Sequence, residues 1–550
     1  MAVQIIANLY KTNPEHRTLI ITHSNAALND IFAKVMIRGD VPPRYLLRLG
    51  SGERSLQTHV YMDESDEAYS KAGRVAHTLQ KRNELLSYVQ TLSVSLQITK
   101  ASDNSEYTCE SSSYFCLHHV QSRIEIFEKK VKALGSVEET TNIIEIFPFS
   151  NYFKLEPTQT VLTLKEARNM FAQLEALFEE LKEYRPLELL RTQRQRTNYL
   201  LTKQAKVIAM TCTHASMIRS QLMNLKFQYD SVVMEEAGQM LEVETFIPLL
   251  LQPGEQSQRL KRLVLIGDHN QLPPVVKNRA FQKYSRFDQS MFSRLIRLGV
   301  PAIQLNCQGR ARHEIANLYR WRYNDLQDLD FGEVSTTYKS ANAGFAHTFQ
   351  FIDVPDYQGQ GESNPAPYVF QNLGEAEYIV AVFQYMVLIG YNPKKISILT
   401  TYNGQKNLIQ DIIAQRCDAS SPLAGVKPGA ISTVDQYQGQ QNDIILLSFV
   451  RTSSLGFMRD VRRFVVATSR ARLGLYTFGR LSLFDGCHEL KEGMAIFHSK
   501  PHKLELVMGE HFGSPRQKNE SIPDGKSYRV EDVETLGSIV HSMLQQQISS

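Results

Sequence analysis

Four polar side chains follow two apolar runs in the first half of the chain, at the point where each run ends. Glu235 and Glu236 come directly after Ser-Val-Val-Met, and Asp268 and Gln271 follow Arg-Leu-Val-Leu-Ile-Gly. A β-branched apolar run indicates a buried strand of a parallel sheet, and ligands bind outside the carboxyl ends of such strands. The sequence therefore predicts that two neighbouring strands bring these four side chains to one crevice.

Phosphoryl transfer is the chemistry that this set of side chains favours. Glu235 can hold Mg²⁺, which bridges nucleotide phosphates, and Glu236 can orient or deprotonate an attacking water. The Gln271 amide can sense the terminal phosphate. The alternative is a pair of strands that simply end in solvated loops, because acidic residues are common at such positions.

The second half of the chain supplies cations for such a site. Arg310 and Arg312 lie beside an expected helix start, and Arg470 and Arg472 follow an apolar run that predicts a strand. Arginines that face a carboxylate crevice act as arginine fingers, because they neutralise charge during phosphoryl transfer. For any one of these arginines, a surface ion pair or a helix-terminal charge is the alternative.

Short apolar runs, each followed by a helical stretch, are the elements that position these residues. Such alternation predicts an α/β fold, and nine runs over this length predict two doubly wound parallel sheets. In the first half the runs are 18–22, 206–212, 231–235 and 262–268, and in the second half they are 302–305, 395–401, 430–436, 443–450 and 463–469.

A long helical pattern separates the first two runs. Leu164, Ala167, Phe171, Leu174, Phe178 and Leu181 recur at three- and four-residue steps, which is typical of an amphipathic helix, and Pro186 predicts a break after it. We expect five segments: 1–51 as the N-terminal part of the first lobe, 52–203 as a mostly helical insertion domain, 204–300 as the rest of the first lobe, 301–512 as the second lobe, and 513–550 as a flexible tail with a short helix.

Composition sets outer bounds on the class of protein. The 550 residues are 42% hydrophobic, so the chain is long enough for two to four domains, and its net charge of +4 indicates polyanion binding only weakly. The longest apolar runs have the length of strands, which argues against a membrane span. Six cysteines without framework spacing fit a reducing compartment. The spacing in CESSSYFCLHH (109–119) is wrong for a zinc knuckle.

The ordered segments resemble the motifs of superfamily 1 RNA helicases of the nonsense-mediated-decay type. TLIITHSNAALNDI is similar to motif Ia, VIAMTCTHA to Ib, VVMEEAGQ to II and LIGDHNQLPP to III, and QGRAR stands where the family has Gln-Tyr-Arg-Met. Later segments are similar to the second-lobe motifs through V and VI: ISILTTYNGQ, STVDQYQGQQNDIILLSFVRT and RRFVVATSRARLG. The segments MEEAGQMLEVETFIPLLLQ and NCQGRARHEIANLYRWRYNDL resemble the intron-binding, spliceosomal branch of that family.

This resemblance implies two RecA-like lobes with the helical insertion domain in the first lobe. It implies a nuclear RNA helicase that uses ATP and Mg²⁺, binds single-stranded intron RNA and works with spliceosomal proteins. The implied catalytic residues are Glu236, Gln271, Arg310 and Arg470; the implied nucleotide-binding residues are Glu235, Asp268, Gly439 and Gln441, with Glu235 as the metal ligand. The implied RNA-binding residues are Ser24, Asn25, Thr211, Thr213, Tyr402, Asn403 and Thr433, whose hydroxyls and amides suit contacts that track a backbone.

The chain departs from the family pattern at three positions. Motif II usually reads Asp-Glu, and here it is Glu235-Glu236; the family tyrosine near the nucleotide base is Gly309; and a Glu of motif V is Gln441. These changes predict altered nucleotide affinity or rate. At the RNA-binding segments, Ser24 or Asn25 could instead cap the following helix.

A phosphate-binding loop of the form Gly-x-x-x-x-Gly-Lys-Thr does not occur in the 550 residues, and DGKS (524–527) mimics only its end, because Glu520 stands where the first Gly belongs. We therefore expect a partial gene product that begins just past that loop, with negligible ATPase activity alone and a tendency to aggregate. A non-catalytic RNA-binding scaffold module is the alternative function, and a DNA helicase is a weaker one.

Overall fold

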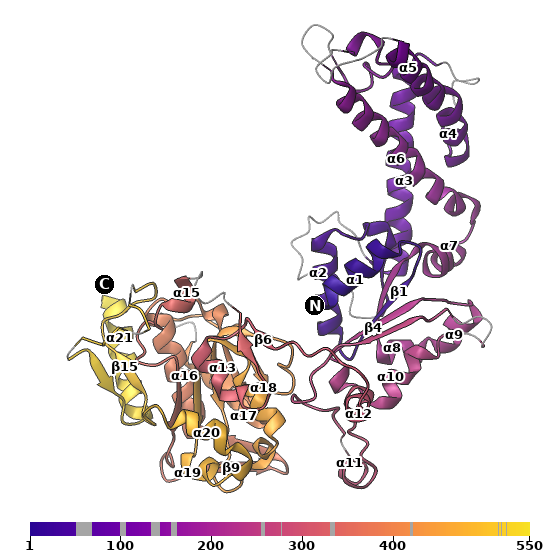
Figure 1. Cartoon of the computed structure of the whole chain (residues 1–550). Coiled ribbons are helices and arrows are strands. Elements are labelled where there is room, and N and C mark those ends of the chain that lie inside the picture. Colours follow the sequence, from indigo (N-terminus) through magenta and orange to yellow (C-terminus); the bar gives the residue numbers. More distant parts are fainter. Residues whose placement is uncertain are drawn as a thin grey trace. The chain divides into compact units, whose positions relative to one another are not determined.

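The computed structural model divides into two compact units (Figure 1). The first unit comprises residues 1–237 and 243–266, and the second comprises 238–242 and 267–550. The residues that the structure describes are 1–50, 69–98, 106–133, 143–155, 162–252, 254, 259–276, 278–329, 336–417, 422–514, 516–518, 520–523 and 525–549.

A five-stranded parallel sheet forms the centre of the first unit, in the order β2-β3-β1-β4-β5. Its strands are β1 (Thr18–Thr22), β2 (Leu46–Arg48), β3 (Val207–Thr211), β4 (Ser231–Glu235) and β5 (Arg262–Leu265). Helices α1 (Ala2–Thr12) and α2 (Asn25–Arg38) pack on it, because Ile6, Leu28 and Phe32 are buried in one core with Ile20 and Val233 of the strands.

A helical region with its own hydrophobic core stands between β2 and β3. Its helices are α3 (Lys71–Ser95), α4 (Cys109–Phe115), η3 (Cys116–Gln121), α5 (Ser122–Ala133), η4 (Ile144–Ile146), α6 (Leu164–Leu189), α7 (Gln193–Tyr199) and η5 (Leu200–Gln204). The stripe predicted on α6 is buried against α3 and α4. Cys109 and Cys116 lie in this core as apolar side chains.

The break predicted at Pro186 is wrong, because α6 continues to Leu189. Tyr184 and Leu187 on either side of the proline are buried in the helical core. The last turn still closes, since the Leu190 N–H donates to the Pro186 carbonyl oxygen at 3.2 Å. Packing of the final turn therefore outweighs the missing proline N–H.

The second unit contains another five-stranded parallel sheet, in the order β12-β11-β13-β14-β8. Its strands are β8 (Phe349–Asp353), β11 (Ile396–Thr400), β12 (Ala430–Thr433), β13 (Asn442–Ser448) and β14 (Ala471–Gly479). Helices α16 (Leu373–Leu388) and α17 (Asn403–Arg416) share one core with the sheet, and α13 (His313–Arg320), α18 (Val461–Thr468) and α20 (Lys491–Phe497) share a second core with it. Two doubly wound parallel sheets were the predicted fold class, and the structure confirms it.

Short elements complete the two units. The first unit adds η1 (Pro43–Tyr45), α8 (Cys212–Met217), α9 (Arg219–Asn224) and most of α10 (Glu242–Leu249), and η6 (Ala237–Gln239) spans the unit boundary. The second adds α11 (Arg279–Ser285), α12 (Met291–Arg297), β6 (Cys307–Gln308), β7 (Gln327–Asp328), α15 (Thr336–Lys339), β9 (Glu362–Ala366), β10 (Val369–Asn372), η8 (Pro393–Lys395), η9 (Gly456–Arg459), α19 (Leu481–Asp485), η10 (His488–Leu490), β15 (Glu505–Val507), β16 (Ser527–Arg529) and α21 (Val533–Ser549).

Two of the predicted strands are wrong. Residues 302–305 form no strand, and Ile303 there is 95% exposed. Residues 463–469 belong mainly to helix α18, which the Asp460 side chain caps by accepting from the Arg462 N–H. A continuous apolar run does not distinguish a buried helix from a strand, and here the capping aspartate decides. Arg470 therefore follows a helix and precedes β14.

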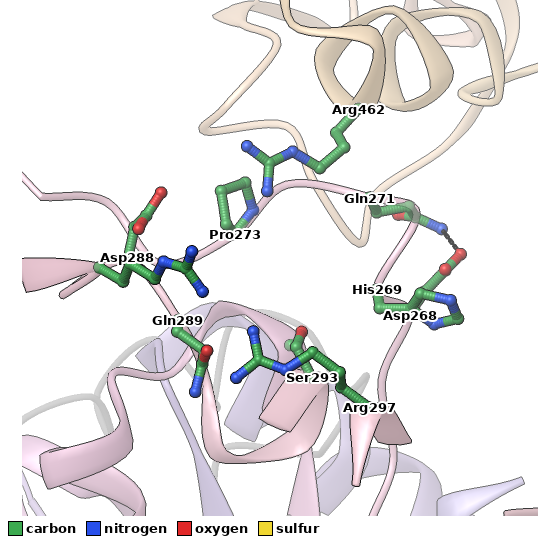
Figure 2. A pocket seen from close by; sticks show the side chains of 11 residues that line it. Asp268, His269, Gln271, Pro273, Asp288, Gln289, Ser293, Arg297 and Arg462 are labelled. Carbon is green, nitrogen blue, oxygen red and sulfur yellow. Dashed lines mark hydrogen bonds between the residues drawn. The ribbon is translucent and has the colours of Figure 1, made fainter. Parts of the chain in front are cut away.

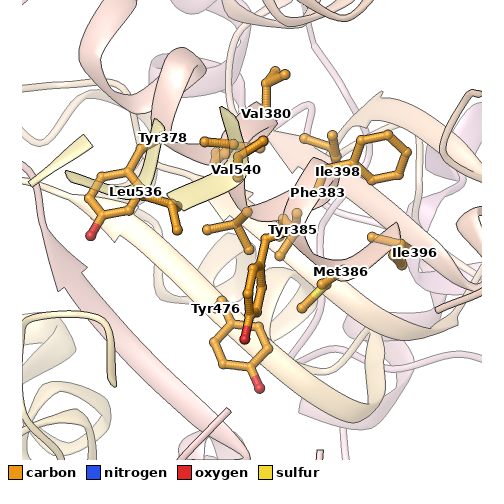
Figure 3. Close-up of a cluster of buried hydrophobic side chains, with 14 of the residues drawn as sticks. Tyr378, Val380, Phe383, Tyr385, Met386, Ile396, Ile398, Tyr476, Leu536 and Val540 are labelled. Carbon is orange, nitrogen blue, oxygen red and sulfur yellow. The ribbon is translucent and has the colours of Figure 1, made fainter. Parts of the chain in front are cut away.

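The C-terminal segment is more ordered than the flexible tail we expected. Strand β16 pairs with β15, and α21 extends over 17 residues. Leu536 and Val540 of α21 are buried beside Tyr378 and Phe383 of α16 (Figure 3). The packing of this segment against the second unit was not predicted, because residues 513–530 are mostly polar in sequence. The apolar positions that anchor the segment come only in its last helix.

Removing the Leu536 side chain tests whether α21 belongs to the core of the second unit. Leu536→Ala is expected to lower the free energy of unfolding by about 2–5 kcal/mol, as for other buried leucines, in urea denaturation followed by circular dichroism. Ser542→Ala on the exposed face of the same helix is the control, with an expected change within about 0.5 kcal/mol. Equal stability of the two variants would contradict the packing of α21.

Candidate nucleotide and nucleic-acid site

Three strands of the first sheet end side by side at one edge. In the parallel register, Thr22 at the end of β1 is the partner of Thr211 at the end of β3 and of Glu235 at the end of β4. The residues that follow these strands therefore begin at one level. This edge carries Ser24, Asn25, Thr213 and Glu236 in the residues that come next.

Glu235 is placed where a cation is favoured. Its Oε2 atom is buried and has no hydrogen-bond partner among the described residues. Burial, and then the neighbouring Glu236 carboxylate, raise the pKa of Glu235 to about 7. Glu236 adopts a left-handed backbone conformation with φ 56°, which is unusual for a residue with a Cβ.

Asp268 and Gln271 belong to a polar network in the second unit. Asp268 Oδ2 accepts from Gln271 Nε2 at 2.9 Å and from the Tyr323 hydroxyl at 2.6 Å. Burial, and then Asp268, hold the pKa of Tyr323 well above its usual range, so the hydroxyl stays a donor. Gly238 lies against this segment, since an added Cβ would come within 3.0 Å of the Asp268 carbonyl oxygen.

Arg470 joins the same network from the other end. Its guanidinium is 1% exposed and donates through Nη2 to Gln271 Oε1 at 3.1 Å and to Ser469 Oγ at 2.8 Å. Nε donates to the Val466 carbonyl oxygen at 2.9 Å. Arg310 also contacts Ser469, because its Nη1 donates to the Ser469 carbonyl oxygen at 3.1 Å. The structure thus brings Asp268, Gln271, Arg310 and Arg470 together.

The other two arginines considered from the sequence have different surroundings. Arg312 is buried and donates to Asn342 Oδ1 and to the carbonyl oxygens of Leu473, Thr337 and Ser340, so it holds the local fold together. Arg472 is partly exposed and pairs with Asp443 at 2.8 Å. Of the four arginines, Arg310 and Arg470 are the two that share the Asp268–Gln271 network.

A cavity of about 310 Å³ opens beside this network in the second unit (Figure 2). Asp268, His269 and Gln271 line it together with three arginines, Arg286, Arg297 and Arg462. The other lining residues are Gly238, Pro273, Asp288, Gln289 and Ser293. Arg462 pairs with Asp460 at 3.0 Å, whereas Arg286 and Arg297 have no acidic partner within the described part of the chain. Sequence reasoning missed Arg286 and Arg297, because they lie in none of the segments quoted above. Arg462 and Tyr323 lie in two of those segments, but only the fold shows that they come close to Asp268 and Gln271.

Two of the four RNA-binding candidates of the first unit cap a helix. Ser24 Oγ accepts from the Ala27 N–H and caps α2, and Thr211 Oγ1 accepts from the His214 N–H and caps α8. Asn25 Oδ1 accepts from Arg48 Nη2 at 2.7 Å, and Thr213 is exposed. The capping alternative therefore holds for Ser24 and not for Asn25, and Thr211 is a cap that the sequence analysis did not consider.

In the second unit, the candidates Tyr402 and Thr433 are buried, and Asn403 is exposed. The Tyr402 ring stacks on Phe457, with centroids 5.0 Å apart, and its hydroxyl accepts from the Phe457 N–H. Phe457 itself is 46% exposed. Tyr402 thus supports an exposed aromatic face, and Phe457 is a candidate that the motifs did not indicate.

The remaining nucleotide candidates, Gly439 and Gln441, lie in the exposed turn between β12 and β13. Gly439 has φ 83°, a conformation that favours glycine. Between them, the Gln440 carbonyl oxygen accepts from Arg470 Nη1 at 3.4 Å. Glu235 and Glu236 belong to the first unit and Asp268 and Gln271 to the second, so the single crevice that we expected for all four remains a prediction.

Two family models together match most of the chain. A family model described as an AAA domain matches residues 1–279, and a second with the same description matches residues 287–482. This chain belongs to the AAA domain family.

Two relatives are close over the whole chain. It is 48% identical over 99% of its length to the RNA helicase aquarius of Mus musculus, and 26% identical over its full length to the pre-mRNA-splicing factor cwf11 of Schizosaccharomyces pombe. The chain spans 36% and 41% of the length of these relatives.

Among solved structures, an arterivirus nonstructural protein 10 (helicase) aligns over 89% of this chain and 63% of its own, at 12% identity and a TM-score of 0.27. A score this low supports no argument. In the described part of the chain, each helix is too short or too polar to cross a membrane.

The raised pKa of Glu235 predicts a pH-dependent stability. Because folding raises the pKa from 4.5 to about 7, the folded state binds more protons between these values, and the free energy of unfolding falls as the pH rises through that window. Glu235→Gln removes this loss. Relative to the parent chain it is expected to gain on the order of 2 kcal/mol between pH 4.5 and pH 8, measured by urea denaturation in EDTA. The same pH dependence in both proteins would show that Glu235 ionises normally.

Proposed function

We propose that this chain is the helicase part of a spliceosomal RNA helicase, which binds intron RNA in the nucleus and couples ATP hydrolysis to RNA remodelling in pre-mRNA splicing. The names of its relatives, an RNA helicase and a pre-mRNA-splicing factor, support this class of activity. Membership of the AAA domain family supports the use of a nucleoside triphosphate.

The observation that carries the proposal is the network from Asp268 through Gln271 to Arg470. Gln271 donates its amide N–H to Asp268 and accepts from Arg470 through its carbonyl oxygen, so its orientation is fixed at both ends. An oriented amide bound to an arginine is suited to detecting the terminal phosphate of a nucleotide. Breaking or remaking these contacts would connect nucleotide state to the position of β14, because Arg470 immediately precedes that strand.

The residues of the first unit fit a divalent cation. Glu235 offers a buried carboxylate oxygen without a hydrogen-bond partner among the described residues, and carboxylate oxygen is the ligand type that Mg²⁺ prefers. Mg²⁺ supplies charge neutralisation on nucleotide phosphates when it is bound. Glu236, held next to it in its left-handed conformation, is then the residue that we assign to orienting the attacking water.

The alternative function is a non-catalytic RNA-binding scaffold, and one observation favours it. The Arg470 guanidinium is already satisfied by acceptors from the protein and is almost fully buried. A buried arginine of this kind can serve as a structural tie between two segments rather than as a finger. The two functions differ in whether RNA stimulates ATP hydrolysis.

Substitution of Arg470 separates these functions. In a version of the chain extended at its N-terminus by a strand and a Gly-x-x-x-x-Gly-Lys-Thr loop, Arg470→Ala is expected to reduce RNA-stimulated ATP turnover by about 10³-fold or more, with ATP binding largely intact. The nearby, partly exposed Arg472 supplies a matched control, since Arg472→Ala removes a charge without touching Gln271. Turnover at the parental rate in Arg470→Ala would show that Arg470 is only a structural residue.

RNA binding is tested on the 550-residue chain itself. Because the contacts are proposed to follow the backbone, affinity for labelled oligouridine and oligoadenosine should be similar and should fall by about one to two orders of magnitude between about 50 and 200 mM salt. Fluorescence anisotropy measures both. An affinity that ignores salt, or that depends strictly on one base sequence, would contradict this mode of binding.

A further inference from the structure

Three side chains with metal-binding atoms meet in the first unit, apart from Glu235 and Glu236. They are His23, Cys212 and Glu244, and one ligand atom from each lies within 4.8 Å of the others. His23 directly follows β1, Cys212 opens helix α8 directly after β3, and Glu244 lies in the first turn of α10. Three separate segments therefore contribute one ligand atom each.

The parallel sheet fixes two of these residues relative to each other. Thr22 and Thr211 are register partners at the ends of β1 and β3, so His23 and Cys212 leave the sheet at the same level. The third ligand comes close as well, since Glu244 Oε2 lies 3.8 Å from His23 Nδ1. The Cys212 side chain is buried beneath them, whereas the His23 side chain is 47% exposed.

The combination of ligand atoms selects the metal. Thiolate sulfur and imidazole nitrogen with one carboxylate oxygen is a set that Zn²⁺ accepts in tetrahedral sites, whereas Mg²⁺ and Ca²⁺ prefer oxygen alone. One thiolate and one carboxylate balance the two positive charges of the ion, so a partly buried site of this kind ends neutral. Three protein ligands leave the fourth tetrahedral position to water.

We propose that His23, Cys212 and Glu244 bind one Zn²⁺ ion, with water as the fourth ligand. On binding, the sulfur–hydrogen bond of Cys212 breaks, its proton passes to solvent and a zinc–sulfur bond forms, with no change of oxidation state. Ligand atoms around tetrahedral zinc lie about 3.5 Å apart, so the three groups must close by about 1 Å. The His23 and Glu244 side chains, which are both at least partly exposed, can supply this movement toward the buried Cys212.

Such an ion would tie together the segments that follow β1, β3 and β4. His23 stands next to Ser24, which caps α2, and Cys212 stands next to Thr211, which caps α8. Zinc would therefore fix two helix starts and α10 relative to the sheet. This inference concerns metal binding by the first unit and holds whether or not the chain acts on RNA.

Cobalt spectroscopy on the full 550-residue chain tests the site. After EDTA treatment, one equivalent of Co²⁺ is expected to give the near-ultraviolet thiolate-to-cobalt band and the visible bands of tetrahedral cobalt, and added Zn²⁺ is expected to abolish both. Cys212→Ser should lose the thiolate band. His23→Ala and Glu244→Gln should weaken Co²⁺ affinity by at least about 100-fold, because loss of even an outer partner of a metal ligand costs 10–100-fold.

Cys487 provides the matched control. It is a buried cysteine with His488 next to it and Glu489 Oε2 3.4 Å from its sulfur, so it offers the same residue types in the second unit. Cys487→Ser should keep the full cobalt spectrum. His23→Ala guards against misfolding as an explanation, because His23 is on the surface.

Two results would overturn the proposal. One is the absence of a thiolate band in the parent chain at one equivalent of Co²⁺. The other is a band that survives in Cys212→Ser or that keeps its affinity in His23→Ala. Zinc-dependent thermal stabilisation supplies an independent readout: Zn²⁺ is expected to raise the melting temperature of the parent chain and of Cys487→Ser, and to leave that of His23→Ala unchanged.

Discussion

Parallel strand pairing is the constraint on which the candidate sites of the first unit depend. In a parallel sheet all strands end at the same edge, so residues that are far apart in sequence leave the sheet together. In the first unit, Thr22, Thr211 and Glu235 are register partners although nearly 200 residues and a helical region separate the first two. The carboxyl edge of that sheet thereby collects the Glu235 carboxylate, two helix caps and the His23–Cys212–Glu244 cluster.

In the second unit, the candidate site depends on the burial of a charged side chain. Arg470 is almost fully buried. A guanidinium in that position is tolerable only because carbonyl, hydroxyl and amide oxygens accept hydrogen bonds from its N–H groups. One of those acceptors is Gln271, which is bound in turn to Asp268. The cost of leaving any member unpaired makes the network respond as a whole. A ligand that bound Gln271 would therefore remove one acceptor from Arg470. This coupling between Gln271 and Arg470 is consistent with a phosphate sensor and also with a structural contact between two segments.

Sequence reasoning predicted most of the sheet strands from short apolar runs, such as the one that contains Val232–Val233, between polar loops. It failed at residues 463–469, where buried positions are consecutive and the Asp460 cap decides for a helix, and at the isolated run that contains Ile303. The polar network could be predicted in part from the order of the motifs, since Gln271 and Arg470 stand in recognisable segments. Tyr323, Arg286 and Arg297 could not, because only tertiary packing brings them to the same cavity. His23, Cys212 and Glu244 lacked any local spacing that signals a metal site.

We propose that RNA contacts the segments that follow the carboxyl ends of the parallel strands in each unit. Photocrosslinking of a 4-thiouridine RNA to the chain, with the modified peptides mapped by mass spectrometry, tests it most directly. The account predicts crosslinks in the segments that follow β1 and β3, near Asn25 and Thr213, and around Asn403 and Phe457 in the second unit. Crosslinks confined to helices α3 to α7, with the strand-end peptides unmodified, would contradict it.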